Sequence, residues 1–145
     1  MKFIAYDTSF LDDCLRLFDE NCPQYFAKNE KEDYLHFLKA LPSSYYVVMV
    51  DKLIVSAFGL SIDTLAQRGR LSWILVSPNA KGTGLGVQMM AFAKNKAIEN
   101  HLLVIDIAAS HLSAPFFAKF GAQTQKQTLD GWGRGMHRVD MELLI

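Results

Sequence analysis

Apolar residues recur at helical spacing in two stretches near the start of the chain, after a short apolar run at residues 3–6 that predicts a strand. The first helix is expected to begin near Ser9 and to end before Pro23. The second is expected to take Asn29 as its N-cap and to stop at Pro42. The apolar stripes consist of Leu11, Leu15 and Phe18 in the first helix, and of Tyr34, Leu35, Leu38 and Leu41 in the second.

The pattern then changes to runs of β-branched and aromatic residues, which predict an antiparallel meander. Residues 45–50 and 53–62 are expected to pair as a hairpin, and residues 70–76 to add a third strand. A polar, turn-like segment separates the second strand from the third. The meander is followed by a glycine-rich loop, at which the spacing of the apolar residues becomes helical again.

The last part of the chain mixes helices and strands. A long amphipathic helix is expected from Leu85 to Ala97, then a buried strand over residues 102–107. Residues 114–120 predict a short helix that ends at Gly121. Apolar and charged residues alternate in the final strand, where Val139, Met141 and Leu143 form the apolar side.

This order of elements, β-α-α-β-β-β-α-β-α-β-β, predicts an α+β fold. The front half is antiparallel, and one βαβ crossover makes the strand at 102–107 parallel to the strand at 70–76. We therefore expect a mixed, mostly antiparallel sheet with helices on both faces.

Composition and charge narrow the class of protein. The chain of 145 residues, half of them hydrophobic, predicts a single domain that spans residues 1–145. Its 15 basic and 15 acidic residues cancel, which argues against nucleic acid as a partner. No apolar run is long enough for a membrane span, and Cys14 and Cys22 have no neighbours at metal-ligand spacing. We expect a cytoplasmic protein with no metal and no membrane partner.

The chemically informative segment is the loop from Val76 to Gly86, between a strand and a helix. Glycines at alternate positions allow backbone N–H groups to converge, and the helix that follows adds the positive end of its dipole. Such a loop binds a diphosphate through its backbone, and Lys81 adds a mobile positive charge. A tight turn without a ligand is the alternative.

Two common diphosphate motifs do not fit this loop. A Walker A loop ends in Gly-Lys-Ser/Thr, whereas this one ends in Gly-Leu-Gly-Val. A dinucleotide fingerprint needs the spacing G-x-G-x-x-G near the first strand of a parallel sheet, whereas here the spacing is G-x-G-x-G after a meander.

The loop resembles the coenzyme-A loop of the GNAT acetyltransferases, Gln/Arg-x-x-Gly-x-Gly/Ala, with Asn79 in place of the usual first residue. The block from Ala109 to Gly121 is similar to the family's segment after the fifth strand. The resemblance implies an N-acetyltransferase that moves an acetyl group from acetyl-CoA to a primary amine of a small molecule or peptide by direct attack. A domain that binds acyl-CoA without efficient transfer is the alternative, and the sequence does not identify the acceptor.

The resemblance also implies which residues hold acetyl-CoA. In the family the strand before the loop bulges and splays from its neighbour, and a backbone N–H there, at Leu75 or Val76, faces the thioester carbonyl. Phe117 stands where the family usually has a proton-donating Tyr, so no side chain is expected to protonate the leaving thiolate. The implied cofactor-binding residues are Leu75, Val76, Asn79, Lys81, Gly82, Thr83, Gly84, Leu85, Gly86, Ser110, Phe116 and Phe117.

Two carboxylates are candidates for the base that deprotonates the acceptor. Asp106 interrupts an apolar strand, and a buried, unpaired carboxylate there would need a partner or a function. Glu30 lies near the start of the second helix, where a favourable helix dipole is the alternative explanation. We favour Asp106 slightly at this stage. Aromatic residues expected to line an acceptor pocket are Tyr25, Phe26 and Trp73, for which a place in the core is the alternative.

The glycine-rich segment around Trp132 is the last candidate. It is expected either to close one side of the acceptor cleft or to contact a second subunit in a homodimer. A mobile hairpin is the alternative.

Overall fold

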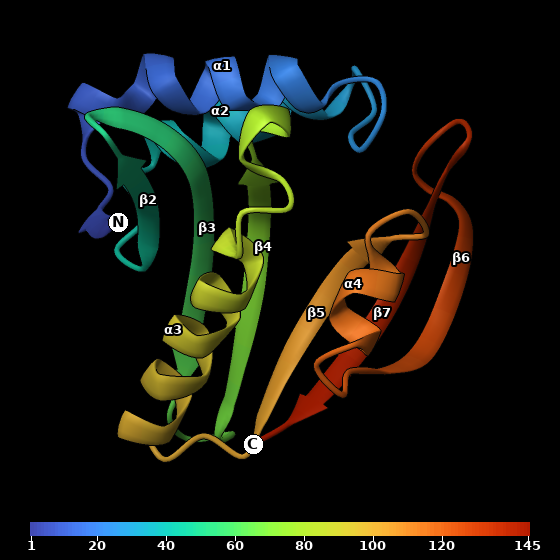
Figure 1. The fold of residues 1–145 in the computed structure, drawn as a ribbon. Coiled ribbons are helices and arrows are strands. Elements are labelled where there is room, and N and C mark those ends of the chain that lie inside the picture. The colour runs from blue at the N-terminus through green and yellow to red at the C-terminus, as the bar shows by residue number, and fades with distance from the viewer.

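The computed structural model describes all residues from 1 to 145, and it places seven strands in one sheet of order β1-β2-β3-β4-β5-β7-β6 (Figure 1). Every neighbouring pair is antiparallel except β4 and β5. The elements are β1 (Lys2–Ala5), α1 (Leu11–Asn21), α2 (Glu30–Lys39), β2 (Tyr45–Val50), β3 (Leu53–Asp63), β4 (Arg68–Val76), α3 (Leu85–Glu99), β5 (Val104–Ser110), α4 (Ala114–Ala118), β6 (Gln123–Gly133) and β7 (Met136–Leu144), with single 3₁₀ turns at Thr8–Phe10 and Pro78–Ala80.

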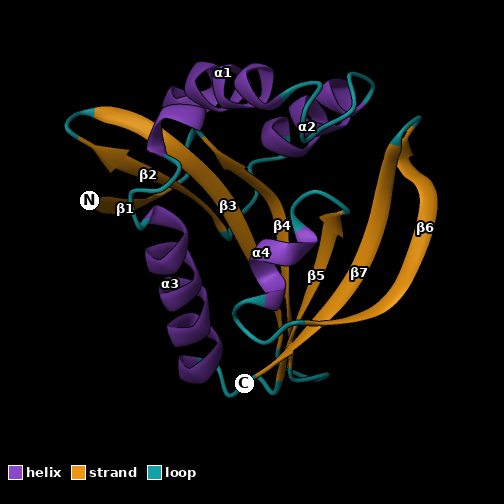
Figure 2. Cartoon of the chain, turned by 45° about the vertical axis from the view of Figure 1, so that its right-hand side comes forward, coloured by secondary structure: helices purple, strands orange, loops and turns teal.

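The helices cover both faces of the sheet, as the sequence predicts (Figure 2). Helices α1 and α2 pack on one face around a cluster that includes Leu17, Tyr34 and Val47. Helices α3 and α4 pack on the other face, where a larger cluster includes Met89 and Phe117. The alternation of apolar side chains along the central strands supplies both clusters. No helix is long and apolar enough to cross a membrane.

Strands β4 and β5 are joined at one end only. Their parallel register runs from the pair Arg68 and Val104 to the pair Leu71 and Ile107, and beyond that point the two strands separate (Figure 1). This confirms the predicted mixed sheet with a splayed parallel pair. The separated end of β4 leads directly into the glycine-rich loop.

A β-bulge on β4 bends that strand at the start of the splay. Phe58 of β3 lies opposite two residues of β4, Trp73 and Ile74. Trp73 has a φ of 47°, a left-handed conformation that is costly for a residue with a large side chain. The Tyr45 hydroxyl donates to the Trp73 carbonyl at 2.6 Å and lies 2.8 Å from the Tyr34 hydroxyl. Two buried tyrosines therefore hold the bulge in place.

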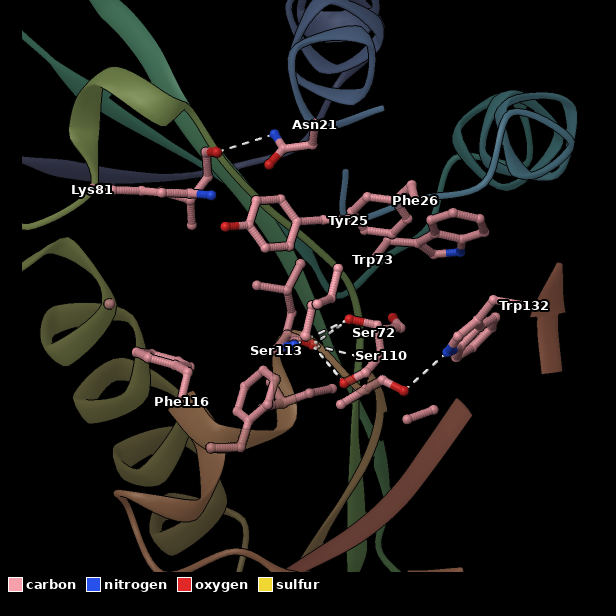
Figure 3. A pocket seen from close by; sticks show the side chains of 18 of the residues that line it. Asn21, Tyr25, Phe26, Ser72, Trp73, Lys81, Ser110, Ser113, Phe116 and Trp132 are labelled. Atoms are coloured by element: carbon pink, nitrogen blue, oxygen red, sulfur yellow. Dashed lines mark hydrogen bonds between the residues drawn. The ribbon is translucent and has the colours of Figure 1, made fainter. Parts of the chain in front are cut away.

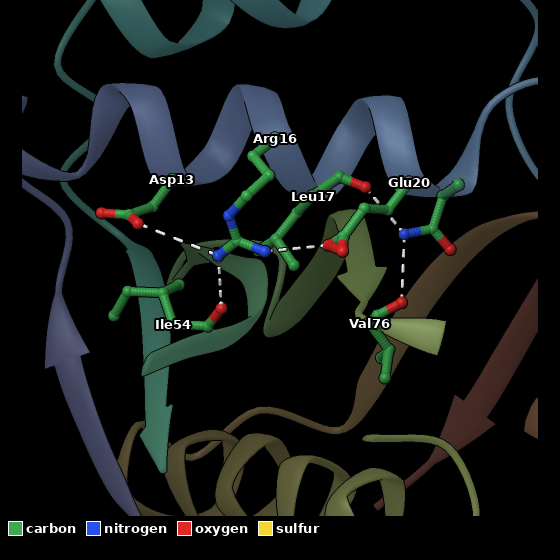
Figure 4. Close-up of polar contacts among 7 residues, drawn as sticks. Asp13, Arg16, Leu17, Glu20, Ile54 and Val76 are labelled. Carbon is green, nitrogen blue, oxygen red and sulfur yellow. Dashed lines mark hydrogen bonds and ion pairs between the residues drawn. The ribbon is translucent and has the colours of Figure 1, made fainter. Parts of the chain in front are cut away.

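Helix α1 is anchored to the sheet by two polar side chains (Figure 4). The Arg16 guanidinium donates to the Ile54 carbonyl at 2.7 Å and binds Glu20 at 2.9 Å. The buried Asn21 amide donates to the Val76 carbonyl at 3.0 Å. These bonds fix the C-terminal end of α1 beside the splayed end of β4.

Some element boundaries differ from the sequence-based expectations. The first turn is a 3₁₀ turn capped by Asp7, whose carboxylate accepts from the Ser9 N–H at 2.8 Å. Asn29 precedes α2 without making a side-chain cap, because its own backbone is helical, with φ −67° and ψ −15°; its side-chain amide donates to the Trp132 carbonyl. Helix α2 ends before Leu41, which adopts a positive φ of 52° and is mostly exposed.

Candidate active site

A cleft of about 580 Å³ passes through the gap between β4 and β5 (Figure 3). On one side of the sheet it is bounded by the glycine-rich loop and by Phe116 of α4. On the other side it is bounded by the segment between α1 and α2 and by Trp132. The cleft thus has two ends, one suited to a phosphate-bearing ligand and one enclosed by aromatic side chains.

The loop end of the cleft is rich in unused backbone donors. None of the N–H groups from Gly82 to Val87 donates to an acceptor within the protein. Gly82 and Gly84 have φ values of 77° and 82°, and a Cβ added at either position would meet open space. Because α3 begins at Leu85, its dipole adds positive potential at the same point. This arrangement suits a diphosphate.

The third glycine of the motif has a different role. A Cβ on Gly86 would lie 2.7 Å from the Phe116 ring, which packs directly over the helix backbone. Gly86 therefore allows α3 and α4 to approach each other, whereas Gly82 and Gly84 shape the loop.

Most of the cofactor residues expected from the sequence line this cleft. Leu75, Asn79 and Thr83 do not: Leu75 is buried in the core, and Asn79 and Thr83 are exposed. The expected residues that line the cleft are Val76, Lys81, Gly82, Gly84, Leu85, Gly86, Ser110, Phe116 and Phe117, together with Tyr25, Phe26, Glu30 and Trp73 of the expected acceptor side.

The end of β4 presents a backbone N–H to the gap. The Ser77 N–H bonds to the Val55 carbonyl at 2.8 Å, and the residues of an antiparallel strand point their main chain alternately toward and away from the partner strand. Val76 therefore directs its N–H away from β3, whereas the main chain of Leu75 faces β3. Of the two alternatives, the geometry favours Val76 as the donor to a bound carbonyl.

Phe117 and Ser110 bound the middle of the cleft. Phe117 is buried and offers only its ring, so no proton donor stands at this position. The Ser110 hydroxyl lies 3.1 Å from that of Ser113 and accepts from the Ser113 N–H (Figure 3). Ser72 contributes a third hydroxyl from β4. The two serines Ser72 and Ser113 were not expected from the sequence, since isolated serines there carry no motif.

Asp106 requires a correction, because it lies outside this cleft. Its carboxylate is half-exposed and accepts two hydrogen bonds from the Arg68 guanidinium, at 2.9 and 2.7 Å. Arg68 also binds Glu142, and the two carboxylates raise the pKa of the guanidinium. The carboxylate of Asp106 is therefore neither buried nor unpaired, and the reason for favouring it as the base no longer holds.

Glu30, unlike Asp106, is a buried carboxylate with no cation beside it. It is only 5% exposed, lines the cleft and contacts no cation. Its carboxylate accepts one hydrogen bond, from the Ala27 N–H at 2.8 Å. Burial raises the pKa of Glu30 to about 7, while the Ala27 bond lowers it and nearby Asp33 raises it further. A carboxylate with such a pKa can accept a proton near neutral pH.

Glu30→Gln tests this environment through stability. The raised pKa means that folding favours the protonated form, so the wild type loses stability as pH rises from about 4.5 through about 7. The variant keeps an acceptor for the Ala27 N–H and has no charge to bury. The difference in free energy of unfolding between the variant and the wild type is therefore expected to shift by about 3 kcal/mol in favour of the variant from pH 4 to pH 8.5. Denaturant titrations at both pH values measure this; an equal difference at the two would contradict the burial of a charge at Glu30.

Aromatic side chains enclose the end of the cleft opposite the glycine-rich loop. The rings of Phe26 and Trp73 stack with centroids 6.2 Å apart, and Trp132 faces them across the opening (Figure 3). The Trp132 indole donates to the Ala109 carbonyl at 2.9 Å, and its ring lies 4.8 Å from the Arg138 guanidinium. The β6–β7 hairpin thus closes one side of the cleft, which is one of the roles expected for the glycine-rich segment around Trp132.

A protein-family model matches most of the chain. Residues 19–145 match the model of the acetyltransferase (GNAT) domain. This region contains the glycine-rich loop and every residue of the cleft. No curated protein matches the sequence significantly.

Solved structures resemble the whole chain at low identity. Ard1 from Thermoplasma volcanium has a TM-score of 0.81 at 14% identity, over 99% of this chain and 97% of that one. The ribosomal-protein-S18-alanine N-acetyltransferase from Escherichia coli has a TM-score of 0.79 at 11% identity, over 99% and 93%. The structure of yncA, a putative acetyltransferase from Salmonella typhimurium with acetyl-CoA, has a TM-score of 0.72 at 15% identity, over 99% and 93%. These likenesses establish a shared fold.

Proposed function

Because this chain belongs to the GNAT acetyltransferase family, we propose that it is an N-acetyltransferase that moves an acetyl group from acetyl-CoA to a primary amine. The observation that carries the proposal is a single cleft that joins an unused set of backbone donors to a buried carboxylate of raised pKa. The first suits a diphosphate and the second suits an amine that must lose a proton. The splayed strands place both on one path through the sheet.

The residues of the cleft fit acetyl-CoA. The N–H groups from Gly82 to Val87 would hold its diphosphate, and the gap between β4 and β5 would take the pantetheine arm. When bound, acetyl-CoA supplies the acetyl group as a thioester. The Val76 N–H would donate to the carbonyl oxygen, where negative charge develops during transfer. Phe116 and Phe117 would form apolar walls that exclude water from the thioester.

Glu30 is the residue proposed to act as the base. A free alkylamine has a pKa near 10 and is mostly protonated at neutral pH, so it must lose a proton before it attacks. Glu30 would accept that proton, directly or through a water molecule. With Phe117 in place of a hydroxyl donor, the thiolate would leave as the anion and take its proton from water, since a thiol has a pKa of about 8.5.

Lys81→Ala tests how the loop binds its ligand. The Lys81 ammonium lies 3.6 Å from the centre of the Tyr25 ring and is exposed, so its charge adds to a site built mainly from the backbone. We expect calorimetry to show coenzyme A bound about three- to tenfold more weakly by the variant, the range of one exposed charge contact. A loss of all binding would mean that the side chain, and not the backbone, forms the site.

The absence of an acid at Phe117 keeps a second function open, a domain that binds acyl-CoA without efficient transfer. A panel of amines with detection of released thiol separates the two. Amine-dependent release supports the transferase, whereas binding of acetyl-CoA with no release for any amine supports the binding domain.

A further inference from the structure

The charged side chains of the cleft are unevenly distributed. Glu30 is the one carboxylate that lines it, whereas three cations do: Lys81, Arg70 and Arg138. Lys81 belongs to the glycine-rich loop. Arg70 on β4 and Arg138 on β7 lie instead in the part of the cleft that Trp132 borders, so two guanidinium groups are available there.

This part of the cleft continues into a second hollow of about 220 Å³ on the same face of the sheet. Arg70, Ala108 and Arg138 line both spaces, so the two are contiguous. The register places Arg70 beside Asp106, and Arg138 beside Ser110. Helices α1 and α2 cover another part of this same face of the sheet. Here the face is uncovered and forms a groove lined by charged side chains.

The acidic residues of this groove already have partners. Asp106 and Glu142 both bind Arg68, and Asp140 accepts a hydrogen bond from Nε of Arg138 at 3.0 Å. The three arginines Arg68, Arg70 and Arg138 balance these three carboxylates, so the groove carries no excess of negative charge.

The two arginines of the groove have donors to spare. The Arg70 guanidinium makes no hydrogen bond or ion pair within the protein. Arg138 pairs with Asp140 through Nε, and its two terminal nitrogens donate no hydrogen bond. The Trp132 ring, 4.8 Å away, holds the Arg138 guanidinium against the closing hairpin. A planar guanidinium with free terminal N–H groups is the geometry that binds a carboxylate through two hydrogen bonds.

We propose that the acceptor of this enzyme is a free amino acid, or a similar small amine that carries a carboxylate, with Arg138 as the anchor of that carboxylate and Arg70 as a second cation that attracts it. This rests on the proposed transferase function and defines its substrate class. The amine would lie toward Glu30, and Phe26, Trp73 and Trp132 would contact an apolar side chain. Polyamines and aminoglycosides offer no carboxylate to these two guanidinium groups and would bring further positive charges beside them.

A panel of matched amines tests the proposal. Each of several amino acids with aromatic, aliphatic and acidic side chains is compared with its own α-amide, and 1,4-diaminobutane is added as a dication. The amine of the amide has the lower pKa and is more often neutral, so solution chemistry alone favours the amide. We expect the free acids to be preferred by at least about tenfold in kcat/KM, the effect of one good charge-assisted pair.

Variants of the two arginines locate the preference. Arg138→Gln is expected to raise KM for the acid about tenfold or more, with little change for the amide, and Arg70→Gln to do so more weakly. Lys52→Gln, in the exposed β2–β3 turn, is the matched control for loss of one positive charge. Unchanged affinity for coenzyme A shows that each variant is folded.

The outcomes separate this inference from the function on which it rests. Preference for amides or for the diamine, or equal loss of activity toward acid and amide in Arg138→Gln, would overturn the proposed substrate class and leave the transferase intact. No turnover of any amine, with acetyl-CoA still bound, would overturn the transferase function itself, and the substrate class with it.

Discussion

Gly84→Asp is expected to abolish detectable binding of coenzyme A while the protein stays folded. Gly84 has a φ of 82°, and a Cβ there would meet nothing within 4 Å, so the new side chain has space. Asp is also among the residues that best tolerate a left-handed backbone. Its carboxylate would enter the region where the free N–H groups converge and would repel a diphosphate. We expect at least a hundredfold loss of affinity by calorimetry, with an unchanged circular dichroism spectrum.

Two control variants distinguish charge from backbone strain. Gly84→Asn has the same shape without the charge and is expected to bind coenzyme A more tightly than Gly84→Asp. Gly135→Asp, at a glycine with a φ of 77° and equally open surroundings in the β6–β7 turn, is expected to bind like wild type. If Gly84→Asp bound coenzyme A with unchanged affinity, the glycine-rich loop would not be the diphosphate site.

Glu30→Gln is expected to lower kcat by about a hundredfold or more on any amine that the protein acetylates. A positioned general base contributes a factor of this size, and the amide cannot accept the proton. The acidic limb of the wild-type rate profile, expected near pH 7 from the raised pKa, should disappear in the variant. Affinity for coenzyme A should remain, because Glu30 belongs to α2 and not to the glycine-rich loop.

Asp106→Asn is the matched carboxylate control. Its side chain binds Arg68 in the neighbouring hollow and not in the cleft, so kcat and the pH profile are expected to stay close to wild type. If Asp106→Asn lost activity and Glu30→Gln kept both kcat and the acidic limb, the assignment of the base would be reversed.

The order of elements could be predicted from the sequence because each element carries its own local pattern. The glycine-rich loop was likewise recognisable, since the spacing of its glycines and its place between a strand and a helix are both local features. The bulge at Trp73 was not, because it depends on hydroxyl groups of Tyr45 and Tyr34, which come from other elements and have no distinctive spacing.

Asp106 and Glu30 show why the base could not be identified from the sequence alone. Asp106 lies between apolar residues in the sequence, but alternate residues of a strand face opposite sides of the sheet, and its side chain meets Arg68 from 38 residues earlier. Glu30 looks like an ordinary charge at a helix start. It is nevertheless buried, where the segment between α1 and α2 packs on the bulge through Phe26 and Trp73, a contact between distant residues that no local pattern predicts.

The most direct test of the central claim is a measurement of thiol release from acetyl-CoA by the wild-type protein at pH 7.5, with and without an amino acid acceptor, followed by mass analysis of the amine. The account predicts release that depends on the amine and an acceptor that gains one acetyl group per thiol released. Release that is the same with and without every amine tested, or an acceptor that is recovered unmodified, would contradict it.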